Sequence, residues 1–211
     1  FGAKNMEDPA RLMESAKRIY KDKMDELWGQ MEAIPAKQLI QVDHNEVIQI
    51  GDTAIKSLHT PGHAKHHIAW QIENAIFTGD VAGVSINNGP VVPPCPPPDI
   101  NIEQWKDSIA MLRAANPKTL YLTHYNEVTA IDNHLDALTK VLDNWANWIR
   151  IKMNDDVSQE EMVPLFMAHT AGQLRAAGLD EEAIALYEAA NPSWMSVAGL
   201  IRYWTKKEKD T

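Results

Sequence analysis

The amino-terminal region carries a helical pattern. Asp8 precedes Pro9, a pair typical of a helix start, because aspartate accepts free backbone N–H groups and proline loses no hydrogen bond in the first turn. Apolar residues then recur every three or four positions. The pattern predicts one long amphipathic helix ending before Pro35, with its apolar stripe at Leu12, Met13, Ala16, Ile19, Tyr20, Met24, Leu27, Trp28 and Met31.

From Gln38 to Asp80 the pattern changes to short runs rich in β-forming residues. Two pairs of runs are separated by turn-forming residues, Gly51-Asp52 and Glu73-Asn74, as hairpin strands are. This order predicts an antiparallel meander. Its strands are expected at Leu39 to Val42, Val47 to Ile50, Ala54 to His59, His67 to Ile72 and Ala75 to Thr78.

A loop and a helical tail complete the pattern. Six prolines between Asn87 and Pro98 exclude a central strand and predict a stiff loop. After Asn154 no strand pattern recurs, so we expect a mixed α and β domain over residues 1–153 and a helical tail over 154–211. The elements expected after the loop are a helix at Asn101 to Asn116, a buried strand at Thr119 to Thr123, a helix at about Val128 to Met153, and tail helices at about Ser158 to Ala177, from Asp180 and from Asn191-Pro192.

Composition narrows the function classes. The 211 residues include 20 basic and 29 acidic ones, and the net charge of -9 argues against nucleic-acid and anionic-membrane partners. The single cysteine, Cys95, excludes an internal disulfide and a multi-cysteine zinc site, and it fits a cytoplasmic location. No apolar run reaches the roughly 18 to 20 residues of a membrane span.

Metal-type ligands follow three predicted strands. His63 comes after a strand and a Pro-Gly turn, Asp80 ends the run Ile76 to Asp80, and His124 ends the run Leu120 to His124. Imidazole and carboxylate groups on separate rigid strand ends are what a zinc or iron site requires. Ordinary surface or packing histidines are the alternative interpretation of the cluster around His63.

The strings HTPGH, FTGD and LTH, in this order, resemble the later ligand motifs of the metallo-β-lactamase superfamily. Residues 191–204 also resemble the ending of glyoxalase-II-like members. The resemblance implies an α/β (α+β) fold: the later half of a four-layer αββα sandwich with a carboxy-terminal helical appendage. It also implies two zinc ions, or iron or manganese. His63 would complete the three histidines of the first metal, Asp80 would bridge both metals and serve catalysis, and His124 would be the last ligand of the second.

The other histidines receive different interpretations. The ligand implied by the resemblance is the histidine after Pro-Gly, so His59 is expected to pack behind the ligands rather than bind metal. At least one of His66 and His67 is expected to pack or hydrogen-bond near the site. His44 and His134 are interpreted as surface residues, and His169 in the tail is a less favoured candidate for approaching the cleft.

One expected motif has no counterpart. The superfamily's leading signature, two histidines one residue apart followed by Asp-His, occurs nowhere in the sequence. We expect the natural protein to be longer, because Phe1 is not a natural start, and we expect the missing amino-terminal half of the fold as a partner. The alternative is a chain that cannot hold a normal two-metal site. For the sequence as it stands we expect partial metal occupancy or none.

The resemblance implies a metal-dependent hydrolase of a small-molecule thioester or ester, in which two metals activate a shared water as hydroxide. A lactam or phosphodiester substrate is an alternative. A diiron redox protein of the same superfamily and a non-catalytic interaction module are rival functions. The loop from Val81 to Pro98 is the expected place for substrate selection, with Cys95 as an ordinary loop residue. Oligomerisation through the helical tail is also expected.

Overall fold

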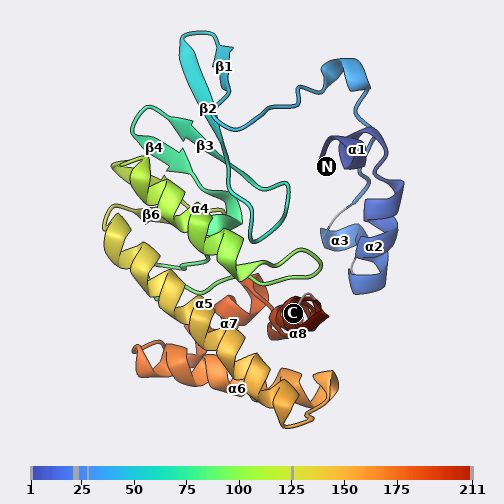
Figure 1. Ribbon diagram of the computed structural model, residues 1–211, viewed down its shortest axis with the longest axis vertical. Coiled ribbons are helices and arrows are strands. Elements are labelled where there is room, and N and C mark those ends of the chain that lie inside the picture. Colours follow the sequence, from blue (N-terminus) through green and yellow to red (C-terminus); the bar gives the residue numbers. More distant parts are fainter. Residues whose placement is uncertain (1, 21–23, 28, 125, 210–211) are drawn as a thin grey trace. The chain divides into compact units, whose positions relative to one another are not determined.

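The computed structural model describes residues 2–20, 24–27, 29–124 and 126–209 (Figure 1). It forms two compact units, residues 1–43 and residues 44–211. The first unit contains α1 (Gly2–Glu7), α2 (Ala10–Tyr20), α3 (Met24–Leu27) and a 3-10 turn, η2 (Ala36–Gln38).

The predicted single long helix is wrong. Its expected start is close, because Oδ1 of Asp8 accepts the N–H of Ala10 at 3.1 Å. However, the last described helical residue is Leu27, and residues 29–34 are not helical. Gly29 has a φ of 59° and donates its N–H to Met24, so a glycine in the left-handed region ends the helical run. Trp28, which the stripe included, lies outside the described residues.

The second unit is built on one six-stranded sheet of order β1-β2-β3-β4-β5-β6. The predicted meander is confirmed: the first four strands pair antiparallel, and β4 then pairs parallel with β5. The hairpins turn at 51–52 and 73–74, as expected. The strands are β1 (Val47–Ile50), β2 (Thr53–His59), β3 (Ile68–Ile72), β4 (Ala75–Phe77), β5 (Thr119–Tyr121) and β6 (Glu127–Val128).

Two strand expectations fail. The segment Leu39 to Val42 is not a strand and pairs with none of the described strands. Its apolar residues are not buried, and Ile40 is well exposed, so the β-type composition has no packing partner there. The short strand β6 was not expected. It pairs with β5 and delays the following helix, predicted from about Val128, to Ile131.

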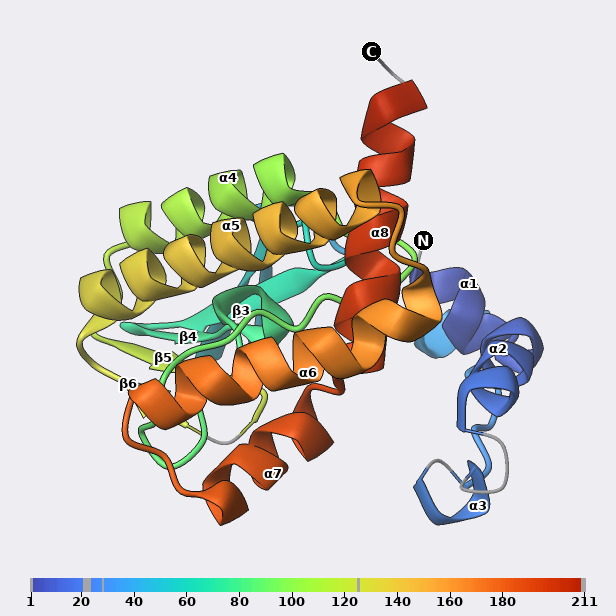
Figure 2. The same cartoon turned by 90° about the horizontal axis from the view of Figure 1, so that it is seen from below.

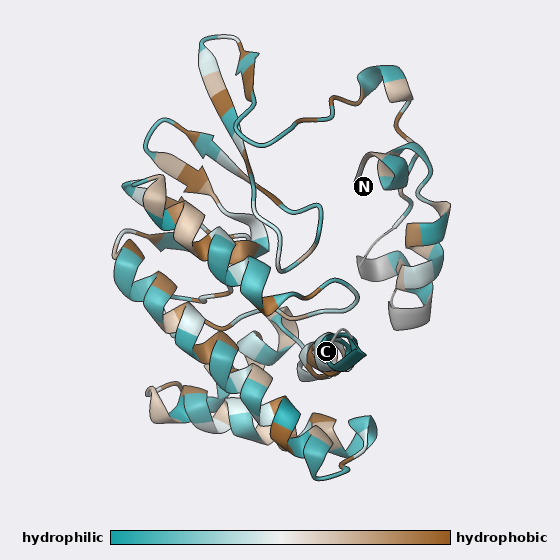
Figure 3. Cartoon of the chain, in the orientation of Figure 1, coloured by the Kyte–Doolittle hydropathy of each residue, from teal (hydrophilic) through white to brown (hydrophobic). Residues whose placement is uncertain are grey.

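Helices α4 (Ile102–Ala114) and α5 (Ile131–Asn154) lie side by side over one face of the sheet (Figures 1 and 2). Asn101, where the sequence predicts the helix to begin, caps α4 by accepting the N–H of Gln104 at 2.9 Å. Polar and apolar stretches alternate along α5 (Figure 3). The buried residues of α5 join those of β4 and β5 in one core cluster, which includes Ile76, Leu120, Leu135, Leu138, Leu142, Trp145 and Ile149.

The opposite face of the sheet carries aromatic side chains. Strand register places Trp70 beside Phe77 and Phe77 beside Tyr121. The rings of Phe77 and Tyr121 stack with centroids 5.1 Å apart, and these residues are 44% and 38% exposed. Large apolar side chains on this face therefore remain accessible to solvent.

The three predicted tail helices are confirmed as α6 (Gln159–Ala176), α7 (Glu181–Ala190) and α8 (Ser193–Lys209). Ser158 and Asp180 cap α6 and α7. Phe166, Val197 and Leu200 from the tail belong to the same buried core as the α5 residues. The two compact units divide between residues 43 and 44, so the tail and the sheet lie in the same unit. None of the described helices is long and apolar enough to cross a membrane.

Candidate metal centre

The three predicted ligands reach one edge of the sheet because of strand direction. The run after β2 turns at Gly62, whose φ of 131° suits glycine, and His63 follows. Asp80 lies in a 3-10 turn, η3 (Gly79–Ala82), just after β4, and His124 follows β5. Because β4 and β5 are parallel, their carboxyl ends lie together, which makes Asp80 and His124 neighbours.

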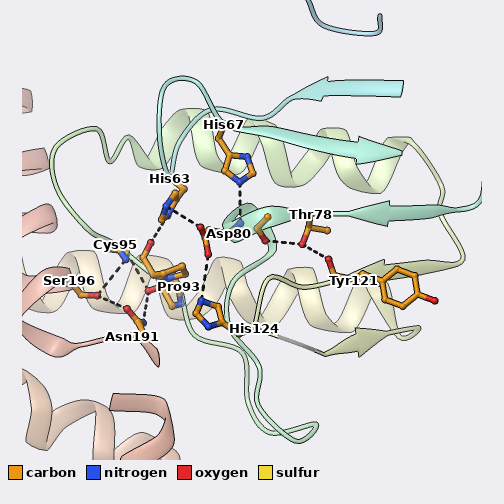
Figure 4. A network of polar contacts seen from close by, with 12 residues as sticks. His63, His67, Thr78, Asp80, Pro93, Cys95, Tyr121, His124, Asn191 and Ser196 are labelled. Atoms are coloured by element: carbon orange, nitrogen blue, oxygen red, sulfur yellow. Dashed lines mark hydrogen bonds and ion pairs between the residues drawn. The ribbon is translucent and has the colours of Figure 1, made fainter. Parts of the chain in front are cut away.

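His63 and His124 converge on the Asp80 carboxylate from two sides (Figure 4). Nε2 of His63 lies 3.5 Å from Oδ2 of Asp80, and Nε2 of His124 lies 3.6 Å from Oδ1. Each histidine thus faces a different carboxylate oxygen. The Asp80 and His124 side chains are 30% and 28% exposed, so this corner is open to solvent.

The other ring nitrogen of His63 fixes its tautomer. Nδ1 lies 2.8 Å from the carbonyl oxygen of Pro94. A carbonyl can only accept, so Nδ1 carries a proton and donates it. The ring also packs edge-on against Trp105, with centroids 5.6 Å apart. Burial lowers the pKa of His63 below its usual 6.5 despite the nearby Asp80, so its neutral form dominates at pH 7.

His67 supports the backbone of Asp80. Its Nε2 accepts the N–H of Asp80 at 3.1 Å, and its Nδ1 donates to Oγ1 of Thr60 at 2.8 Å. Burial lowers its pKa to about 4, so the ring is neutral at pH 7. A methyl group on Gly79 would lie 2.4 Å from Nε2 of His67, so the ring needs glycine at that position. Because both its nitrogens are engaged, His67 holds the turn that carries Asp80.

Asp80 is ionised at neutral pH. Partial burial acts to raise its pKa, but the hydrogen bond with His124 and the charges of His63 and His124 outweigh burial and lower the pKa below 3.8. The corner therefore combines an anionic carboxylate with a neutral imidazole whose lone pair points at it.

Comparison with known proteins shows what the chain is similar to in sequence and fold. No protein-family model matches the chain. The curated Metallo-beta-lactamase fold-containing protein ST1585 of Sulfurisphaera tokodaii is 31% identical over 130 residues, which cover 61% of this chain and 49% of that protein. The chain thus spans about half the length of the curated relative it matches. In sequence and in fold the chain is therefore similar to proteins of the metallo-β-lactamase superfamily.

Solved structures of the superfamily agree on the fold. The crystal structure of ST1585 from Sulfolobus tokodaii matches 60% of this chain and 49% of its own, with 28% identity and a TM-score of 0.52. The metallo-beta-lactamase family protein TTHA1429 from Thermus thermophilus matches 98% and 64%, with 15% identity and a TM-score of 0.54. A beta-lactamase domain protein from Burkholderia ambifaria matches 90% and 55%, with 14% identity and a TM-score of 0.52. Members of the metallo-β-lactamase superfamily are generally metal-dependent hydrolases.

The remaining histidines lie away from the carboxylate or behind it. The ring of His59 forms a hydrogen bond through Nε2 with the carbonyl of Lys65. The backbone N–H of His59 donates to Nδ1 of His44. His66 is exposed. His169 stacks on Trp148 and bonds with Asn144, so it belongs to the packing of the tail.

His134 corrects the sequence interpretation. It was expected at the surface, but it is half-buried, and its Nε2 lies 2.8 Å from the carbonyl of Ala82, two residues after Asp80. Pro94, Trp105 and Thr60 also support the site without having been predicted to do so. These contacts join residues far apart in sequence, and no local motif announces them.

The donor set of the metallo-β-lactamase superfamily is only partly present. Among the described residues no group of three or more histidine, cysteine, aspartate or glutamate side chains is arranged to hold one ion. This agrees with the pairwise geometry, because each Asp80 oxygen faces a single histidine. The residues fit a metal site as two pairs of donors that share one carboxylate.

Proposed function

We propose that this chain contributes His63, Asp80 and His124 to the metal site of a hydrolase. The observation that carries the proposal is the orientation of the His63 imidazole ring. Its Nδ1 proton goes to Pro94, so an Nε2 lone pair faces an ionised carboxylate oxygen 3.5 Å away. Two acceptors face each other stably only when a cation lies between them. Because burial lowers the pKa of His63, a metal ion suits that place better than a proton.

The donor distances support the same conclusion. Two ligands held about 2.0–2.2 Å from a tetrahedral zinc ion lie roughly 3.3–3.6 Å apart. The two nitrogen-to-oxygen distances at Asp80 are 3.5 Å and 3.6 Å. Since each histidine uses a different oxygen, the arrangement suits a carboxylate shared between two ions.

In this function the residues of the chain have distinct tasks. When bound, the metal ions supply Lewis acidity and lower the pKa of a water towards neutrality. Asp80 would hold the metal together with His63 and His124, and its exposed side leaves room for a substrate. His67 and Gly79 keep the Asp80 turn in place, and Pro94 keeps Nε2 of His63 directed at the site.

We further propose a small-molecule thioester or ester as the substrate. The resemblance of residues 191–204 to the ending of glyoxalase-II-like members supports this class. The charge of -9 disfavours polyanionic partners.

The remaining metal ligands are proposed to come from the part of the fold that this chain does not span. The aromatic sheet face of Trp70, Phe77 and Tyr121 supports the proposal, because such a face packs well against a second sheet. The chain also matches only 49% of its curated relative. A complementary segment would thus complete both the core and the donor set.

Metal binding tests the proposal most directly. Equilibrium dialysis with Zn²⁺, Co²⁺ or Fe²⁺ should show that Asp80→Asn and His63→Ala weaken binding by at least about 10-fold, since each removes a donor. His169→Asn is the matched control, because that histidine packs in the tail. Binding that is equal in all three variants would overturn the ligand assignment. An absorption spectrum of the iron form would separate a redox protein from a hydrolase.

Activity provides the second test. With thioester and ester panels and added Zn²⁺, the chain alone should turn over far below the ordinary range of about 1 to 1000 per second, because each metal position has only two donors. Adding a complementary segment that carries the missing histidines should raise the rate. No rise despite restored metal binding would argue against hydrolysis.

A further inference from the structure

The proline-rich loop receives several of its hydrogen bonds from the tail. Proline has no N–H, so a segment with six prolines between residues 87 and 98 can form little regular pairing of its own. Tail side chains bond to its carbonyls instead. Tyr187 donates to Pro90 at 2.7 Å, Asn191 donates through Nδ2 to Pro93 at 3.1 Å, and Lys206 donates to Pro98 at 2.9 Å.

Helix α8 packs directly against the loop at Cys95. The N–H of Cys95 points to Oγ of Ser196 at 3.4 Å, and Ser196 donates to Oδ1 of Asn191 at 3.2 Å (Figure 4). A methyl group on Gly199 would lie only 1.9 Å from the Cys95 carbonyl oxygen. Backbone therefore packs directly on backbone at this point.

Pro94 lies between the two anchored residues, Pro93 and Cys95. Its carbonyl oxygen is the group that accepts the Nδ1 proton of His63 at 2.8 Å. Asn191 and Ser196 are both buried, so their side chains have little freedom to move. A continuous path of contacts thus runs from α8 through residues 93–95 to the imidazole of His63.

We propose that Asn191 and Ser196 are positioning residues that set the tautomer and direction of His63. The inference rests on the proposed role of His63 as a metal ligand. It gives the helical tail a function at the metal site: the tail holds the Pro94 carbonyl where His63 must donate, so Nε2 keeps its lone pair for the metal. Groups that orient a histidine ligand in this way tune metal affinity.

The test uses the full chain and the double variant Asn191→Ala/Ser196→Ala. The control is Trp204→Phe, which removes a different hydrogen bond of α8, from Nε1 of Trp204 to the carbonyl of Ala146 at 2.8 Å, and leaves the loop contacts intact. Thermal unfolding would establish that both variants fold. If the double variant does not fold, the single Ser196→Ala variant takes its place.

The first readout needs no metal. Long-range ¹H–¹⁵N spectra report the tautomer of His63, assigned with His63→Gln. The wild type and Trp204→Phe should show Nδ1 protonated, whereas the double variant should show a mixture of tautomers. An unchanged His63 tautomer in the double variant would overturn the inference.

The second readout is the affinity for Co²⁺. The double variant should bind about 10-fold more weakly, at the lower end of the 10- to 100-fold effect typical of groups behind a ligand, while Trp204→Phe stays within about 2-fold. If the double variant and Trp204→Phe lose Co²⁺ affinity equally, α8 has only a structural role. If His63→Ala leaves Co²⁺ affinity unchanged, the proposed metal ligand is wrong, and the tautomer readout still decides the positioning.

Discussion

Helix α4 passes so close to Gly62 that a methyl group on Gly62 would lie 2.3 Å from Cα of Trp105. Further contacts fasten the same turn to the helix. The N–H of Asn101 donates to the carbonyl of Gly62 at 2.9 Å, and Oγ of Ser108 donates to that of Pro61 at 2.6 Å. The turn that presents His63 is thus held against the backbone of α4.

Gly62→Ala should destabilise the fold strongly. The substitution adds a clash with backbone and places a side chain at a φ of 131°. Together these effects should lower the free energy of unfolding by roughly 2–4 kcal/mol. Urea unfolding followed by circular dichroism would measure the loss, and metal affinity should fall with it because His63 is displaced.

Gly172→Ala is the matched control. Gly172 lies inside α6, and nothing would approach its added methyl group within 4 Å. The substitution should be neutral or stabilise the helix by up to about 1 kcal/mol. Equal urea midpoints for the two alanine variants would contradict the packing described at Trp105.

Stability should fall as the pH falls below neutrality, partly through His134. Burial lowers the pKa of His134 below 6.5, more than its hydrogen bond to Ala82 raises it. Below about pH 6.5 the unfolded chain therefore takes up a proton that the folded chain resists, so folding loses free energy. Above that pH both states are neutral and the effect vanishes.

The variant His134→Gln isolates this contribution. Glutamine keeps an N–H donor for the Ala82 carbonyl but does not titrate. Urea unfolding with EDTA at pH 7.5 and 5.5 should show a smaller loss of stability for the variant than for the wild type. His63 and His67, whose pKa values are also lowered, act equally in both proteins. Identical losses would mean that His134 titrates normally in the folded chain.

Local chemistry explains which elements could be predicted from the sequence. Asn101, Ser158 and Asp180 each cap a helix by accepting a backbone N–H three positions on, so these helix starts depend on local residues. The segment Leu39 to Val42 has suitable β-forming residues but lacks a pairing partner, which a local pattern cannot supply. The long helix failed for a local reason, because Gly29 interrupts a periodic stripe that counted only apolar positions.

The candidate site also has features that the sequence predicts and features that it does not. Convergence of His63, Asp80 and His124 follows from strand ends, which composition and turns reveal. The Pro94 carbonyl that fixes His63 is 31 residues further along the chain, and its position depends on the packing of α8. Tertiary contacts of this kind determine ligand direction, and periodicity carries no information about them.

Cys95 should be unreactive in the folded protein. It is fully buried, its thiol lies 3.6 Å from the carbonyl of Pro93, and burial raises its pKa far above the ordinary value. A thiol-specific reagent at pH 8 should label it only as fast as the protein opens, since the thiolate is the reactive form. Labelling in 6 M guanidinium, about the concentration that unfolds even hyperstable domains, should be complete. Rapid labelling without denaturant would contradict the packing of the loop against α8.

Residues 44–211 should fold without residues 1–43, but not without the tail. The core cluster contains residues from Leu58 to Tyr203, and the tail supplies Phe166, Val197 and Leu200. Removing residues 154–211 would also expose Trp145, whose ring packs edge-on against Phe166. Each large apolar side chain left exposed costs about 1.5–3 kcal/mol, which is a large share of a typical stability of about 5–15 kcal/mol. Thermal melts should therefore show a cooperative transition for 44–211, within a few degrees of the full chain, and none for 44–153. A cooperative melt of 44–153 would show that the tail is an appendage to an independent core. It would also remove the physical basis for the role of α8 in holding His63.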